Sequence, residues 1–149
     1  MQASELAELR TMYIFSPPPG QTWGLTYSAL KDRLLERDPD SFIQVEDPRS
    51  EPLLGGRAMH FGITLSDEAL EGVAKLDPEG IALNDGTAAL AAEFSQWLRD
   101  QIVPQGQSIT FNTEWGWESD VADALVPEAS QDEVVEQFIA HLVATGDLD

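Results

Sequence analysis

The sequence predicts an α+β fold: a two-layer sandwich in which a mainly antiparallel sheet of about five to six strands has three amphipathic helices on one face. Two segments, 58–65 and 108–113, alternate apolar and polar residues, as strands do when one face meets a core. Three longer segments repeat apolar residues at helical spacing. A doubly wound parallel sheet is disfavoured, because its strands would be apolar on both faces. The expected order in the single domain, residues 1–149, is β-α-β-β-β-β-α-β-α.

The N-terminal part is expected to supply two strands and a helix. β-Branched and aromatic residues at 11–15 are typical of a strand, and the prolines that follow end it because they have no N–H to donate. A helix is predicted from the N-cap Thr26 to Asp38, which precedes Pro39. The remaining segments are a frayed N-terminal helical turn at 1–10, a strand at 41–45 and a mobile loop at 46–57.

The central part predicts three more strands. In segment 58–65 the apolar residues Met59, Phe61, Ile63 and Leu65 point one way, and His60, Gly62 and Thr64 the other. Strands at 72–76 and 81–84 flank a turn at 77–80, where Pro78 and Gly80 suit a type I turn.

Two further helices are predicted. One covers 87–102 and ends before Pro104. The other begins after Ser130, which forms a capping box with Glu133, and ends at Gly146. Its expected apolar stripe consists of Val134, Val135, Phe138, Ile139, Leu142 and Val143.

Two tryptophans close the strand that begins near residue 108. If the alternation continues to 117, Trp115 and Trp117 share the face of Ile109 and Phe111, so both indoles are expected over the core or its rim. The alternative is a bulge at Gly116 that turns one indole outward as an anchor. The candidate binding face is acidic and aromatic, and consists of Glu114, Trp115, Trp117, Glu118 and Asp120.

The charge is strongly negative and uneven. The net charge is −19, and residues 100–149 hold 11 of the 27 acidic residues but no Lys or Arg. Such a surface is common in soluble bacterial proteins, and it also attracts basic partners. With only eight Lys and Arg residues, binding to nucleic acid or to an anionic membrane is disfavoured. The absence of cysteine, of a secretory signal and of a membrane-spanning apolar run favours a cytoplasmic location.

Residues for catalysis are sparse. The two histidines, His60 and His141, are expected at the surface or its rim, and no metal-binding, phosphate-binding or serine-nucleophile motif is present, so neither a metal nor a cofactor is expected. One polar face is conceivable if segments 58–65 and 108–114 are neighbours. It would consist of His60, Thr64, Thr110, Asn112 and Glu114.

Charge and composition therefore favour a non-catalytic interaction domain that binds a basic protein partner, with an inhibitory or immunity-like role as one form of this function. The alternative is a small enzyme or ligand-binding protein that uses the polar face with His60 and Glu114.

Overall fold

The computed structural model describes residues 3–45, 58–76 and 79–145 and confirms the α+β class. The strands of this part are β1 (Thr11–Ser16), β2 (Ile43–Val45), β3 (Met59–Leu65), β4 (Glu68–Leu76), β5 (Glu79–Gly86), β6 (Thr110–Thr113) and β7 (Ala124–Leu125). The helices are α1 (Ala3–Glu8), α2 (Tyr27–Arg37), α3 (Ala88–Gln101), α4 (Glu114–Glu118) and α5 (Gln131–Thr145). The predicted loop at 46–57 lies outside the described residues.

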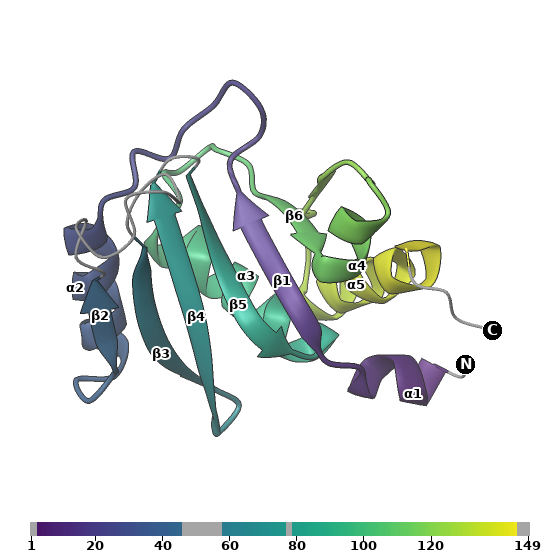
Figure 1. The fold of residues 1–149 in the computed structure, drawn as a ribbon, viewed down its shortest axis with the longest axis horizontal. Helices are drawn as coiled ribbons and strands as arrows, with labels where there is room; N and C mark the ends of the chain where they lie inside the picture. The colour runs from purple at the N-terminus through teal and green to yellow at the C-terminus, as the bar shows by residue number, and fades with distance from the viewer. Residues whose placement is uncertain (1–2, 46–57, 77–78, 146–149) are drawn as a thin grey trace.

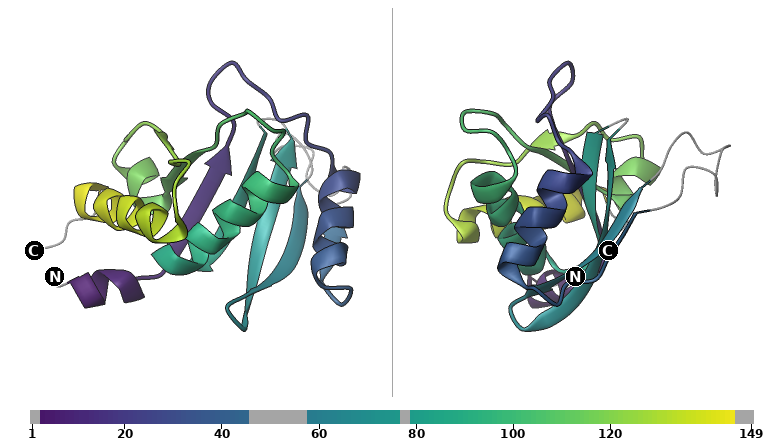
Figure 2. Two further views of the ribbon diagram at one scale, coloured as in Figure 1. Left: turned by 180° about the vertical axis from the view of Figure 1, so that it is seen from behind. Right: turned by 90° about the vertical axis from the view of Figure 1, so that its left-hand side faces the viewer.

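All seven strands of the described part form one antiparallel sheet in the order β2-β3-β4-β5-β1-β6-β7. Helices α2, α3 and α5 lie on one side of this sheet (Figures 1 and 2). The centre of the other face, formed by β4, β5 and β1, carries no helix of the described residues (Figure 1). The predicted two-layer arrangement is therefore confirmed, with β7 as an additional short edge strand.

Two hairpins build the middle of the sheet. The β4–β5 hairpin was predicted, although residues 77–78 of its turn are outside the described part. The β3–β4 hairpin was not predicted. Ser66 and Asp67 form its two-residue loop with φ of 49° and 65°, and this left-handed pair matches the twist of the flanking strands. The dipeptide lacks the glycine that usually marks such a turn.

The core lies between the sheet and helices α3 and α5. Phe138 of α5 is fully buried, and its ring centroid lies 4.5 Å from that of Phe111, 5.3 Å from Tyr13 and 6.1 Å from Phe15. Each such aromatic pair contributes about 0.5–1.5 kcal/mol beyond the burial of its area. Phe138 thus fixes α5 against β1 and against β6, the strand that leads into α4.

The predicted helix starts are confirmed by their caps. The hydroxyl of Thr26 accepts the Ala29 N–H, and that of Thr87 accepts the Leu90 N–H. Ser130 Oγ accepts the Glu133 N–H at 3.3 Å, which is one half of the predicted capping box. The predicted α5 stripe needs one correction: Val143 is 55% exposed, whereas His141 is buried. Gly146 lies outside the described residues.

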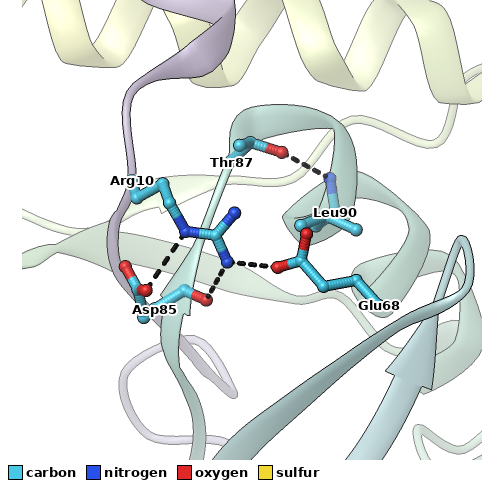
Figure 3. A network of polar contacts seen from close by, with 5 residues as sticks. All are labelled: Arg10, Glu68, Asp85, Thr87 and Leu90. Atoms are coloured by element: carbon cyan, nitrogen blue, oxygen red, sulfur yellow. Dashed lines mark hydrogen bonds and ion pairs between the residues drawn. The ribbon is translucent and has the colours of Figure 1, made fainter.

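The N-terminal segment is tied to the sheet through Arg10 (Figure 3). Its guanidinium donates to the side chain of Asp85 at 3.1 Å, to the Asp85 carbonyl at 3.2 Å and to the carboxylate of Glu68. Exposed ion pairs contribute at most about 1 kcal/mol each. Leu6 of α1 is buried as well. The polar contacts of Arg10 and the burial of Leu6 together hold this segment against the domain.

The prediction for residues 108–117 is wrong beyond Thr113. The strand β6 ends there, because the Thr113 hydroxyl accepts the Gly116 N–H at 3.1 Å and caps helix α4. The side chains of β6 still alternate between the two faces of the sheet, but all four residues are buried, so the polar ones are not exposed. Thr110 and Asn112, which were expected on an exposed polar face, are 4% and 2% exposed.

Candidate functional site

The open face of the sheet has apolar side chains at its centre. The strand register places Val73 of β4, Ala82 of β5, Ile14 of β1 and Asn112 of β6 in one row across the sheet. These residues share a face, because directly opposed residues in a sheet point the same way, and this face is opposite to that of the core residues of β1. Val73, Ala82 and Ile14 of this row provide the floor of a shallow site.

A hollow of about 390 Å³ lies over this row and is called the Trp117 groove below. It is lined by Met12, Ile14, Ser16, Val73, Lys75, Glu79, Gly80, Ile81, Ala82, Trp117 and Asp123. The carboxylate of Glu79 is already used, since it accepts hydrogen bonds from Thr22 Oγ1, Trp23 N and Leu25 N. Asp123 Oδ1 accepts a hydrogen bond from Asn112 Nδ2 at 2.9 Å. Lys75 and the second carboxylate oxygen of Asp123 are therefore the charged groups of this lining that remain for a ligand.

Trp117 is the most exposed aromatic feature of this site. It lies in α4, which follows β6 near one end of the sheet (Figure 1), and it is 62% exposed. The expectation that both indoles lie over the core or its rim is thus wrong for Trp117, while Trp115 is half-buried. The alternative, one indole turned outward, describes Trp117 correctly, but a helical turn places it there and not a bulge.

The acidic residues predicted beside the tryptophans do surround Trp117 in the chain and are exposed. The side chains of Glu114, Glu118 and Asp120 make no hydrogen bond or ion pair within the described residues. They are consequently available to a partner, and the structure keeps this predicted group of residues together on α4 and the turn after it.

Asn112 of β6 forms hydrogen bonds to the chain that follows α4. Its Nδ2 donates to Val121 O and to Asp123 Oδ1, both at 2.9 Å, and its Oδ1 accepts the Thr113 N–H at 2.8 Å. Every hydrogen-bonding group of the amide except one lone pair is thereby used. Asn112 is therefore a structural residue that folds the chain after α4 back onto β6, and not part of a polar ligand site.

Thr113 and His141 have the spacing of a nucleophile and its base, with 3.0 Å between Thr113 Oγ1 and His141 Nε2. Thr113 is fully buried, however, and its Oγ1 already accepts the Gly116 N–H. A substrate atom has no access to this oxygen. The prediction that His141 lies at the surface or rim is also wrong, since it is 9% exposed and its ring packs at an angle against Phe111, with 4.9 Å between the centroids.

The alternative polar face does not exist. Strands β3 and β6 are not neighbours, because β4, β5 and β1 lie between them. His60 and Thr64 of β3 are therefore separated from Thr110, Asn112 and Glu114 by several strand spacings of about 4.8 Å each. The geometry that would have placed a titratable base beside Glu114 is absent.

A second hollow, of about 420 Å³, lies at the end of α3 beside Arg99 and Gln107. Arg99 donates to the carbonyls of Pro127 and Val126 at 3.0 and 3.2 Å. These contacts bind the segment before α5 to α3. Arg99 thus serves the fold at this position.

Sequence reasoning missed the floor of the Trp117 groove. The strand at 11–16 has apolar residues at both parities, with Tyr13 and Phe15 toward the core and Met12 and Ile14 toward the groove. This pattern indicates an apolar patch, because an antiparallel strand that is apolar on both faces either is covered on both faces or exposes one of them.

No family model matches the chain, and no match was found among curated proteins or solved structures. Within the described residues, no three side chains of His, Asp or Glu come together as a metal site. The helices of the described part are all too short or too polar to cross a membrane. Function must accordingly be inferred from the Trp117 groove and its acidic border.

Replacing Gly116 with alanine should displace α4 and lower the free energy of unfolding by about 1–3 kcal/mol. A Cβ at this position would lie 1.9 Å from Asn112 Oδ1 and 3.1 Å from His141 Nε2. The usual gain of about 1 kcal/mol for alanine over glycine in a helix is too small to offset this overlap. Urea denaturation measures the change, and a variant as stable as the parent would contradict the close packing of Gly116 on Asn112.

Proposed function

We propose that this protein is a non-catalytic, cytoplasmic interaction domain that binds a basic protein partner through the Trp117 groove and the carboxylates beside it. The observation that carries the proposal is Trp117, 62% exposed at the edge of an apolar hollow on the open face of the sheet. Large apolar side chains exposed next to a concave apolar surface mark interaction sites. By covering a basic surface, such a domain could block its partner's activity.

The neighbouring chain segment extends the apolar surface. Val121 and Leu125 are 38% and 63% exposed. Leu125 pairs with Thr110, which pairs with Ser16, so these residues share the open face of the sheet. Leu125 therefore adds an exposed apolar side chain at the β7 edge of the same face, beyond Ser16 and Thr110, and widens the surface open to a partner.

The charges indicate which partner fits. Glu114, Glu118 and Asp120 border Trp117 in the chain, and an arginine or lysine of a partner could stack on the indole while pairing with a carboxylate. The lining of the groove also holds one cation, Lys75. The three carboxylates of Glu114, Glu118 and Asp120 outnumber it, so the summed charge still favours a cationic partner group.

Reversing Glu114, Glu118 and Asp120 to lysine should weaken binding to the partner at least tenfold and reduce its salt dependence. The partner is first isolated by affinity capture from the native lysate at low and high salt, and binding is then measured by surface plasmon resonance. Electrostatic steering acts mainly on the association rate, so most of the loss at low salt should appear there.

The matched control reverses three exposed acids at the other end of the sheet, Asp32, Glu36 and Asp40, on and just after α2. It changes the net charge by the same amount. If both triple variants weaken binding equally, total charge and not the α4 surface attracts the partner. Unchanged binding in the α4 variant would refute the proposed site.

A further inference from the structure

A chain of buried hydrogen bonds connects α5 to the helix that carries Trp117. The Gly116 N–H donates to Thr113 Oγ1 at 3.1 Å, and Thr113 Oγ1 lies 3.0 Å from His141 Nε2. Thr113 is fully buried and His141 is 9% exposed. Since Trp117 directly follows Gly116, the position of its backbone depends on this chain of contacts.

The contacts suit a neutral imidazole. The Thr113 hydroxyl has one proton and two lone pairs, and one lone pair takes the Gly116 N–H. Its proton can then be donated to an unprotonated Nε2. A protonated imidazole carries N–H at both ring nitrogens, so Nε2 can no longer accept. The hydroxyl proton then loses its acceptor, and the Thr113 oxygen must accept from both His141 and Gly116.

The surroundings of Nε2 are closely packed. An atom as small as a Cβ on Gly116 would already lie 3.1 Å from His141 Nε2 and 1.9 Å from Asn112 Oδ1. The Phe111 ring lies against the imidazole, with 4.9 Å between the centroids. The free-energy cost of a buried charged imidazole is lowered most directly if α4 moves away from α5, because water then reaches Nε2.

We propose that His141 is a proton-sensitive latch on α4: the neutral imidazole holds this helix in the position that presents Trp117, and protonation releases it. The role as a regulator of binding rests on the proposed function of the Trp117 groove, whereas the latch itself rests on the contacts of His141, Thr113 and Gly116. His141 acts here as a positioning residue.

The direction of the effect follows from burial. Burial lowers the pKa of the His141 imidazole from its ordinary value of 6.5, so the latched form excludes the proton and the released form accepts it. Acidification below about pH 6.5 therefore shifts the population toward the released form. The charged residues on helices packed against α5 are Glu5 and Glu8 of α1, Glu93, Arg99 and Asp100 of α3, and Glu114 and Glu118 of α4. Helix α5 itself carries Asp132, Glu133 and Glu136. Of the strands that contact α5, β6 carries no titratable residue, and β1 carries Tyr13, which packs against Phe138.

The test is a titration of the whole chain from pH 7.5 to 5.0, followed by two-dimensional NMR of the Gly116 amide, the Trp117 indole N–H and the His141 ring. A Trp117→Phe variant identifies the indole signal among the four tryptophans. We expect all three signals to shift with one common midpoint below pH 6.5. In His141→Gln the shifts of Gly116 and Trp117 with that midpoint should disappear, and in His60→Gln, which removes the other histidine, they should persist.

The latch would be overturned if the His141 ring titrates while the Gly116 and Trp117 signals stay unchanged. It would also be overturned if the Gly116 and Trp117 signals of His141→Gln still shift with the same midpoint, because carboxylates would then cause the shift. If His141→Gln does not fold, Thr113→Val removes the hydroxyl at similar size, and the signals of Gly116 and Trp117 should then no longer follow the His141 ring. Loss of this coupling supports the latch, and its persistence refutes it. No partner is present in the titration. A negative result for the latch is therefore distinct from a negative result for partner binding.

Discussion

Replacing Gly72 with alanine is expected to lower the free energy of unfolding by about 3 kcal/mol. Gly72 pairs with Phe61 on β3 and with Leu83 on β5, and the Phe61 ring lies directly across its Cα. A Cβ here would lie 2.4 Å from that ring and 2.6 Å from the Ala82 carbonyl oxygen. Because Phe61 is fully buried and also packs near Phe94, with 6.2 Å between centroids, the ring cannot move aside without disturbing the core.

The matched control for this variant is Gly62→Ala on the neighbouring strand. Its Cβ would meet Phe42 Cβ at 3.5 Å, which is an ordinary contact, and Gly62 lies on the open face. Alanine should be tolerated there within about 1 kcal/mol, because the smaller loss of backbone entropy offsets the change in packing. Chemical denaturation of both variants gives the comparison. Equal stabilities would show that Phe61 does not pack over Gly72 as the structure has it.

The elements that could be predicted from the sequence are those specified locally. Helix α3 follows from apolar residues at helical spacing and from Thr87, whose side chain satisfies a free N–H of the first turn. The alternation of β3 was read correctly for the same reason, since a strand covered on one face has a period of two. Neither inference required knowing what lies next to the element.

One error was local, and the others arose where distant residues decide the outcome. The alternation of residues 108–113 was extended to residue 117 without regard to the Thr113 side chain. That side chain accepts a backbone N–H of α4, so it ends the strand and starts the helix. His141 lies three residues after Phe138 and so belongs to the buried stripe, but its polarity suggested exposure. Its burial depends on Thr113, 28 residues earlier in the chain. The β1–β6 pairing, which separates His60 from Thr110, is likewise non-local.

The candidate site was predicted in part for a related reason. The acidic and aromatic residues at 114–120 stand together in the sequence, so local order was sufficient to group them. The floor beneath them comes from three other strands, β1, β4 and β5, which only the sheet order brings together. The residues of the proposed surface that adjoin one another in the chain could thus be grouped from the sequence, while its concave part depends on the tertiary fold.

Replacing Trp117 with alanine is expected to weaken binding to the captured partner by about 2–4 kcal/mol, or roughly 30- to 1000-fold, the range of a central tryptophan in an interface. The indole supplies the largest apolar surface at the groove and the π face on which a cation can stack. Trp117→Phe keeps part of both and should lose less affinity. Calorimetric titration of each variant with the partner measures these differences in affinity. In surface plasmon resonance, most of the loss should appear as faster dissociation.

The stability of the free protein separates this effect from unfolding. Because Trp117 is 62% exposed, its removal should change the free energy of unfolding by no more than about 0.5 kcal/mol. The matched control is Phe42→Ala, which removes an aromatic side chain that is 52% exposed beside β2, at the opposite edge of the sheet from α4. Its affinity for the partner should be unchanged. If Trp117→Ala binds the partner as tightly as Phe42→Ala does, the open face at β1 and β5 is not the interface, and the exposure of Trp117 must have another physical cause.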